Sequence, residues 1–332
     1  CVEEFSTDGT RFALADAGDS MEDANFDRSV ANNAILYLFT EEEWFRGVLT
    51  DYHADSLRTG ELSFMDKTFS NEMDFQIEAT KTAFEQMMYK EGLVRCWFDM
   101  MIARDIYRDW STRCHIPMHR DVIMRFIESV IVMMSPITPH WCECLWEALG
   151  KDGLVLDATW PVYTSYNKLL RKQYLFFRDF MKNIRLAAMK VKNPADKKIA
   201  HVYLANSYEP KKVTMLRYLQ TIINSDGSFS SDLMSQMKSY LEGQTDLKKD
   251  TKILMQFGAF MRDEAKERGP DALASEMAFD QKAILQENSV YITKALELTG
   301  VKFYNVEDSD VPGDKKKMDT AVPGKPAYHF FS

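Results

Sequence analysis

Apolar residues recur every three or four positions through much of residues 71–192, a spacing that places them on one face of an α-helix. The repeat predicts helices over residues 71–110, 120–134, 138–149 and 166–192, and another over residues 20–48. Successive amphipathic helices joined by short loops bury their apolar faces against one another. The sequence therefore predicts a mainly α-helical fold built on a helical bundle.

Residues with strong terminal preferences mark where these helices begin and end. Ser20 and Asp23 have the spacing of a capping box, in which two side chains satisfy backbone amides at a helix start. Pro136 ends one helix, and Pro139 occupies the first turn of the next. Gly92 interrupts the longest helix, where the missing Cβ allows a bend or the close approach of another helix.

The pattern changes after Pro194. Residues 200–205 and 301–306 have the apolar alternation of short strands. Between them the spacing predicts helices at 209–223, 230–241, 248–268 and 279–298. Two strands that bracket helices predict a small α/β appendage on the bundle. Residues 307–332 are rich in Asp, Pro, Gly and Lys, which predicts a linker or a frayed end.

Charge is distributed unevenly along the chain. The 332 residues are enough for about two domains, and their 45% hydrophobic and 27% charged content is that of a globular protein with a net charge of −9. Residues 1–70 carry fifteen acidic and five basic side chains, whereas residues 168–198 carry ten basic and two acidic ones. This asymmetry indicates a polyanionic partner for one part of the chain.

The predicted helix at 166–192 has one hydrophobic and one cationic face. At 100° per residue the apolar side chains share one arc: Leu169, Phe176, Phe177, Phe180, Ile184, Ala187 and Val191. The bases occupy another arc: Lys168, Arg171, Lys172, Arg178, Lys182, Arg185, Lys190 and Lys192. Such a face can simply be solvated, but eight bases repel one another unless an anion offsets them. The sequence therefore favours a phosphate-backbone partner.

A second basic set lies on the long helix and its neighbour. Its members are Arg95, Arg104, Arg108, Arg113, Arg120 and Arg125. Acids are interspersed with them at helical spacing: Glu91, Asp99, Asp105, Asp109 and Asp121. Two interpretations stand side by side, one of ion pairs within and between helices and one of a second binding surface that includes Arg104 and Arg108.

Catalytic and metal-binding patterns are absent from the sequence. It contains no glycine-rich phosphate loop, zinc-protease motif or nucleophile elbow. His140, Cys142 and Cys144, with Cys114 and His115, raise the question of zinc. Residues at i and i+2 point to different helix faces, and no second pair has ligand spacing, so buried structural thiols are favoured.

Four other histidines are expected to have no shared role. His53, His119, His201 and His329 are far apart in the chain, which favours separate surface or capping positions.

Cysteine usage and hydropathy indicate the compartment. Five cysteines in a chain of this length form no disulfide framework, which favours a reducing compartment. The longest apolar stretches, such as residues 130–134, are far shorter than the ~20 residues that span a bilayer. No charged-then-apolar leader opens the chain, so secretion is not expected. Because the first residue is Cys, we expect an internal piece of a larger protein.

Several segments carry a family resemblance. They are residues 6–19 (STDGTRFALADAGD), 22–26 (EDANF), 87–93 (MMYKEGL), 135–140 (SPITPH), 145–146 (LW), 160–161 (WP), 287–291 (ENSVY) and 323–326 (PGKP). Together they resemble the leucyl-tRNA synthetases of the cytosolic eukaryotic and archaeal type, over nearly all of the chain.

The resemblance implies a domain organisation. Residues 1–65 correspond to the stem-contact segment that follows the class I catalytic core, and residues 66–195 to the helical tRNA (anticodon)-binding bundle. Residues 196–306 correspond to a peripheral α/β subdomain, followed by the linker or frayed end at 307–332. The fold class implied is thus an anticodon-binding-type helical bundle with a small α/β appendage.

The resemblance also implies an activity. The family activates leucine with ATP, transfers it to tRNA(Leu) and edits misacylated products. The HIGH and KMSKS motifs, the editing insertion and the module that reads the tRNA long arm have no counterpart in residues 1–332. The segment alone is therefore expected to be inactive and to hold no cofactor or metal, with ATP and Mg²⁺ bound elsewhere in the parent enzyme.

The implied partners are tRNA(Leu), the catalytic core of the parent chain, and other synthetases or scaffold proteins, in the cytoplasm and without a membrane. The expected phosphate contacts are Lys168, Arg171, Lys172, Arg178, Lys182, Arg185, Arg104 and Arg108, none of them a catalytic acid or base. Two alternatives remain open: a non-enzymatic helical scaffold for protein partners, and the equivalent piece of a valyl- or isoleucyl-tRNA synthetase.

Overall fold

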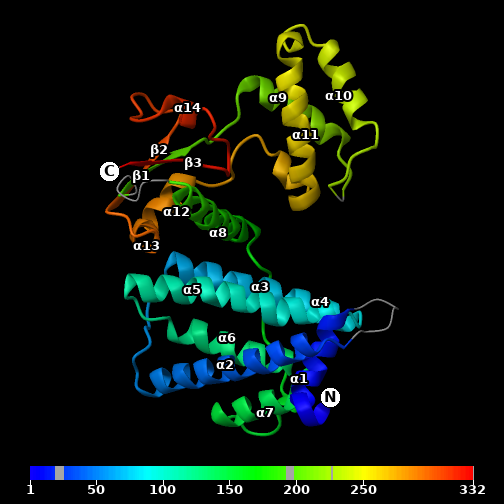
Figure 1. Cartoon of the computed structure of the whole chain (residues 1–332), viewed down its shortest axis with the longest axis vertical. Coiled ribbons are helices and arrows are strands. Elements are labelled where there is room, and N and C mark those ends of the chain that lie inside the picture. Colours follow the sequence, from blue (N-terminus) through cyan, green and yellow to red (C-terminus); the bar gives the residue numbers. More distant parts are fainter. Residues whose placement is uncertain (19–25, 192–197, 226, 332) are drawn as a thin grey trace. The chain divides into compact units, whose positions relative to one another are not determined.

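The computed structural model describes residues 1–18, 26–191, 198–225 and 227–331. The chain forms two compact units, which we call the N-terminal unit (Cys1–Tyr174) and the C-terminal unit (Leu175–Ser332). Figure 1 shows that helices dominate and that the strands form one small sheet, as the sequence predicts. Within the described ranges, no helix is both long and apolar enough to span a membrane.

The N-terminal unit is a helical bundle. Its elements are α1 (Val2–Ala17), α2 (Arg28–His53), α3 (Phe64–Glu85), α4 (Tyr89–Leu93), the π-helical segment η1 (Val94–Asp99), α5 (Met100–Cys114), α6 (Arg120–Met134), α7 (Pro139–Ala148), the 3₁₀ turn η2 (Val155–Asp157) and the start of α8 (Lys168–Met189). The bounds of α6 and α7 agree with the expected helices at 120–134 and 138–149.

The first helices differ from expectation. Helix α1 was not predicted. The capping box proposed at Ser20 and Asp23 lies outside the described residues, and α2 instead begins after Asp27, whose carboxylate accepts a hydrogen bond from the amide of Ser29.

The single helix predicted over 71–110 is wrong. The chain turns at Gln86–Met88, where Met87 adopts a positive φ of 59°, and α3 lies alongside α5 (Figure 1). The apolar period continues through Phe84, Met87 and Met88, so the pattern hides the reversal.

Gly92 enables the close packing of this hairpin. A Cβ at Gly92 would lie 2.1 Å from the ring of Phe84, a separation that real Cβ atoms do not show. Of the two roles predicted for this glycine, the structure therefore shows the close approach of a neighbouring helix.

Aromatic rings fill the core of the bundle. Phe45 packs against Phe126 with ring centroids 6.1 Å apart and against Trp141 at 5.8 Å, and Trp97 meets Trp141 edge-on at 5.6 Å. All four side chains are buried. Pairs of this geometry contribute about 0.5–1.5 kcal/mol each beyond their burial, so this cluster joins α2, η1, α6 and α7.

The C-terminal unit contains the rest of α8 and a three-stranded sheet of order β2-β1-β3. Its central strand, β1 (Ile199–Leu204), is parallel to β2 (Gly300–Asn305) and antiparallel to β3 (Ala327–Phe331). The first two strands match the sequence prediction.

The linker or frayed end predicted at 307–332 is wrong. This region includes α14 (Lys315–Met318) and β3, whose residues pair in register with all of β1 except Leu204. The Asp/Pro/Gly/Lys-rich stretch supplies the connection into β3, and its composition obscured the five-residue strand that follows.

Helices between β1 and β2 complete this unit. They are α9 (Pro210–Ile222), α10 (Leu233–Glu242), the 3₁₀ turn η4 (Lys248–Asp250), α11 (Thr251–Arg268), the 3₁₀ turn η5 (Pro270–Leu273), α12 (Gln281–Glu287) and α13 (Ser289–Ala295). Helices α9, α10 and α11 share their own core, in which Leu219, Met237 and Leu254 are buried. The one helix expected at 279–298 is divided in two at Asn288.

We predict that Gly92→Ala destabilises the N-terminal unit by about 1–3 kcal/mol, because the added methyl group must displace the Phe84 ring. Chemical denaturation of the full chain measures the change. Gly47→Ala is the matched control, since nothing lies within 4 Å of its Cβ position in α2, and we expect it to stabilise by about 0.5–1 kcal/mol. Equal effects of the two substitutions would contradict the packing argument.

Candidate nucleic-acid interface

The first turns of α8 lie in the N-terminal unit and divide their bases between interior and surface. Arg171 Nε donates a hydrogen bond to Glu72 Oε2 at 3.1 Å, and its guanidinium lies 3.5 Å above the centre of the Phe75 ring. Lys168 and Lys172 are exposed. Arg171 is therefore bound internally, whereas the two lysines face solvent.

In the C-terminal unit, α8 is amphipathic in the way the sequence predicts. Phe177, Phe180 and Ile184 are buried. Arg178, Lys182 and Arg185 lie on the exposed side, at the i, i+4 and i+7 positions that share one helix face. The apolar arc is less regular near the helix start, where Leu169 is exposed rather than buried.

Among the described residues, acidic side chains offset little of the charge of Arg178 and Lys182. Arg178 Nη2 lies 3.6 Å from Asp179 Oδ1, a long contact between partly exposed groups. Arg185 Nη2 donates to the hydroxyl of Tyr291 at 3.4 Å. Lys182 has no carboxylate partner within the described part of the chain. Lys190 is exposed, and Lys192 lies outside the described residues.

The second basic set consists mainly of ion pairs. Arg95 pairs with Glu91 and Asp99, Arg113 with Asp109, Arg120 with Asp55, and Arg125 with Asp74. Of the two interpretations left open, the structure supports ion pairing for these arginines.

Arg104 corrects the predicted set of phosphate contacts. It is 1% exposed, and its Nη1 and Nη2 donate to the two carboxylate oxygens of Glu41 at 2.5 and 2.7 Å. Nε donates to Asp105 at 2.9 Å, and the guanidinium lies 4.2 Å from the centre of the Trp44 ring. A guanidinium enclosed in this way cannot reach a phosphate. Arg108 is half-buried, and its Nη2 lies 3.0 Å from the same Asp105.

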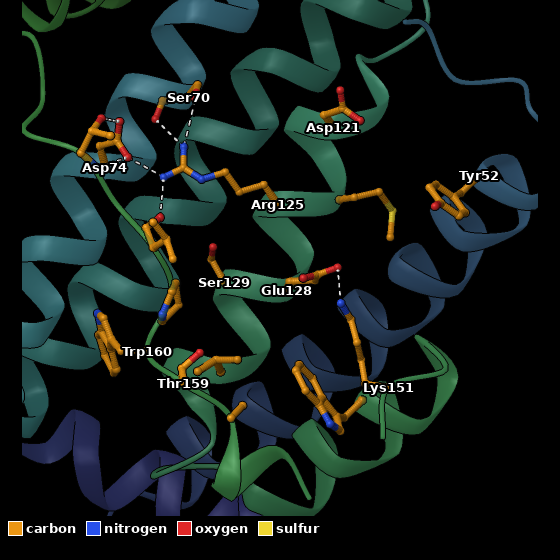
Figure 2. A pocket seen from close by; sticks show the side chains of 17 residues that line it. Tyr52, Ser70, Asp74, Asp121, Arg125, Glu128, Ser129, Lys151, Thr159 and Trp160 are labelled. Atoms are coloured by element: carbon orange, nitrogen blue, oxygen red, sulfur yellow. Dashed lines mark hydrogen bonds and ion pairs between the residues drawn. The ribbon is translucent and has the colours of Figure 1, made fainter. Parts of the chain in front are cut away.

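A cavity of about 970 Å³ opens in the N-terminal unit (Figure 2). It is lined by α6, the end of α2, parts of α3 and α7, and the segment 158–164. Figure 2 shows Arg125 turned toward Ser70 and Asp74 at one side, and Lys151 turned toward Glu128 at the other. The Lys151 ammonium lies 2.9 Å from Glu128 Oε1. Four of the cavity's charged groups thus form two ion pairs, Arg125 with Asp74 and Lys151 with Glu128.

The cavity could not be foreseen from local patterns, because its wall combines segments more than a hundred residues apart in the chain. Its one unusual feature is a pair of indoles, Trp146 and Trp160, whose Nε1 atoms are buried without a hydrogen-bond partner in the described residues. In the sequence, the two tryptophans are the only feature that could have indicated this cavity.

Cysteines and histidines only partly follow expectation. Cys142 is buried, as expected, and burial raises the pKa of its thiol. Cys144 is exposed, which corrects the expectation of a buried thiol, and accepts a hydrogen bond from Arg46 Nη2 at 3.1 Å. The separate positions expected for His201 and His329 are wrong, since the two residues pair directly across β1 and β3. The described residues contain no group of three or more His, Cys, Asp or Glu that could hold a metal ion.

Comparison with known proteins finds a matching domain in the chain. Residues 66–204 match the family model described as the anticodon-binding domain of tRNA ligase. The match begins in α3 and ends at the last residue of β1, so it contains all of α8.

Relatives match the chain over almost its whole length. A cytoplasmic leucine–tRNA ligase from Pongo abelii is 34% identical over 98% of this chain, and those of Dictyostelium discoideum and Saccharomyces cerevisiae are 34% and 31% identical over 99%. The chain is a relative of the leucyl-tRNA synthetases. The resemblance inferred from the sequence is therefore confirmed, and the leucyl-type match includes both units.

This chain spans about three tenths of the length of these leucyl-tRNA synthetases, namely 28% of the Pongo protein and 32% of the Saccharomyces protein. The part that it shares with them includes the anticodon-binding domain and the region that follows. The similarity thus concerns a segment of the ligases.

We predict that Arg104→Ala destabilises the N-terminal unit by about 2–4 kcal/mol, because it leaves Glu41 partly buried without its partner. Arg108→Ala is the matched control on the same helix. Its partly solvent-exposed contact with Asp105 predicts a destabilisation below about 1 kcal/mol. Urea unfolding of both variants measures the difference, and similar destabilisation by the two would show that burial of Arg104 carries no special weight.

Proposed function

We propose that this chain is the tRNA-binding portion of a leucine–tRNA ligase and that α8 contacts the sugar-phosphate backbone of tRNA(Leu). The observation that carries the proposal is the exposed cationic side of α8 inside a segment that matches an anticodon-binding domain. The relatives described above are leucine–tRNA ligases, which supports the leucyl over the valyl or isoleucyl alternative.

The proposed contacts are the exposed bases, Lys168, Lys172, Arg178, Lys182 and Arg185. Arg171 is assigned a structural role because Glu72 and Phe75 hold its guanidinium. Lysine and arginine side chains that neutralise phosphates release counterions from the RNA, and this release favours binding without reading sequence. The contact is therefore expected to position the tRNA rather than to select its bases.

The proposal assigns the chemistry of the reaction to other parts of the parent enzyme. Activation of leucine with ATP and Mg²⁺, and its transfer to tRNA, would take place in the catalytic core that the relatives possess beyond this segment. The described residues of this chain offer neither a metal cluster nor a phosphate loop for that chemistry. We further propose that the parent enzyme acts in the cytoplasm, as the names of the relatives state for them.

A second candidate function is protein docking. Leu36 and Phe39 on α2 are 59% and 62% exposed and lie three residues apart, on one side of the helix. An apolar docking surface of this kind would retain its partner at high salt, whereas a phosphate contact weakens as salt rises. A pull-down of bound partners at low and at moderate salt therefore distinguishes the two functions, because bound tRNA is lost as salt rises and a docked protein is retained.

We predict that Arg178→Glu with Lys182→Glu weakens tRNA binding by the full chain nearly uniformly across tRNA sequences. The slope of log K against log salt concentration should flatten by about 0.7–0.9 for each phosphate that the protein no longer neutralises. Lys238→Glu on α10 is a matched control, since Lys238 is exposed on a helix outside the proposed interface. An unchanged affinity and slope in the double variant would remove α8 as the contact.

A further inference from the structure

One face of the sheet carries a basic row that crosses all three strands. His201 of β1 lies beside Lys302 of β2 and opposite His329 of β3. Residues in register across neighbouring strands point to the same side of a sheet, and opposite Cβ atoms lie about 4.5–5.5 Å apart. The three side chains therefore lie close together, although they are separated by up to 128 positions in the sequence.

Aromatic residues border this row on both sides. Tyr203 and Tyr304 are neighbours in register on one side, and Phe331 stands opposite Ile199 on the other. The His201 ring lies 4.9 Å from Tyr304 and 4.5 Å from Phe331, measured between ring centroids. The face thus combines bases with flat apolar rings, a composition found where proteins bind nucleic-acid backbones and bases.

The two histidines have unused hydrogen-bonding capacity. His201 is 9% exposed, and the Nδ1 atoms of His201 and His329 are both buried without a partner in the described part of the chain. A buried polar atom in this condition destabilises the fold, because it has lost its hydrogen bonds to water without replacing them. Such atoms are rare enough in folded proteins to call for an explanation.

The charges around the histidines are mostly positive. Lys302 is exposed and has no carboxylate partner among the described residues, and Lys317 of α14 acts on His329. Asp314, at the start of α14, is the one acid that acts on either ring in the described structure. This environment repels a metal cation and attracts an anion.

The same environment favours the neutral form of both histidines by lowering their pKa. Burial lowers the pKa of His201, and Lys302 and His329 lower it further, while the carbonyl of Pro312 opposes them. Burial and Lys317 lower the pKa of His329, against the opposing effect of Asp314. An anion beside the rings would reverse the electrostatic part of these shifts.

We propose that this face of the sheet is a second RNA contact, at which a phosphate group binds Lys302 and draws protons onto His201 and His329. The inference rests on the proposed function, because the RNA that it contacts is the one held by α8. It adds a proton-linked contact, which the lysines and arginines of α8 cannot provide, since their charge does not change near neutral pH.

Proton linkage determines whether the affinity for RNA rises or falls with pH. Between the lowered pKa of the free histidines and their raised pKa in the complex, each histidine takes up a proton on binding. The affinity for RNA then rises as pH falls, by up to tenfold per pH unit for each proton taken up. We expect tRNA to bind the full chain about tenfold or more tightly at pH 6 than at pH 8, at constant salt.

The test uses the full chain with His201→Gln and His329→Gln combined, and separately with Lys302→Gln. The double variant should lose most of the pH dependence of tRNA binding, and Lys302→Gln should flatten the salt slope by about 0.7–0.9. His140→Gln, which changes a histidine beside Asp8 in the N-terminal unit, should keep the pH dependence. Lys238→Gln should keep the affinity.

NMR titration of the histidine Cε1 protons provides a readout that does not depend on the variants. In the unmodified chain, tRNA should raise the pKa of both histidines. Equally large shifts with inorganic phosphate alone would overturn RNA docking in favour of a site for small free anions. Unchanged histidine titration with bound tRNA, or persistent pH dependence in the double variant, would also overturn it.

The two proposals fail in different ways. If the unmodified chain binds no tRNA at any pH, the proposed function is wrong. If it binds tRNA with affinity that depends on Arg178 and Lys182 but not on His201, His329 or Lys302, only the contact on the sheet is wrong.

Discussion

The N-terminal unit depends on one buried carboxylate. Asp66 is 0% exposed, and it accepts hydrogen bonds from the hydroxyl of Tyr107 at 2.5 Å, from the amide and hydroxyl of Ser63 at 2.7 Å, and from Arg58. Burial acts to raise the pKa of this carboxyl, but the donors outweigh it and the pKa is lowered. A charge in this position is tolerable only while every donor remains in place.

This requirement connects distant parts of the chain. Tyr107 of α5 donates to Asp66 of α3, and the same hydroxyl accepts the amide hydrogen of His119 at the start of α6. Arg58, from the segment between α2 and α3, also bonds the carbonyl of Glu61 at 2.9 Å. Four segments are therefore fixed around one charge, and the aromatic core packs against a framework that these bonds define.

Charge compensation also distinguishes the arginines that stabilise the fold from the bases that we propose as RNA contacts. Arg104 and Arg171 each face a carboxylate and an aromatic ring, so their charge is used inside the bundle. Arg178 and Lys182 stand on the solvent side of α8 with little acidic compensation. A base is available to a phosphate where the protein leaves its charge unbalanced, and this criterion, rather than the number of bases, is the basis on which we propose α8 as the contact.

Local sequence patterns predicted the helices and strands better than they predicted which side chains and strands pair with one another. Helix α6 was predictable at both ends because its apolar period is regular and Pro136 follows it closely. The reversal near Met87 was not, because periodicity records which face a residue occupies and not the direction of the chain. The burial of Arg104 was hidden because Glu41, its partner, is 63 residues away. The pairing of His201 with His329 was hidden for the same reason, since strand register is a property of the fold.

The order of the strands has a consequence for how the protein is made. The central strand, β1, receives one neighbour from Gly300–Asn305 and the other from Ala327–Phe331. During synthesis, a ribosome completes β1 long before either neighbour has emerged, and its backbone must wait unpaired while α9 to α13 appear. The cluster formed by α9, α10 and α11 has its own core and can form in that interval. The sheet, by contrast, can close only when the last of these residues leaves the exit tunnel.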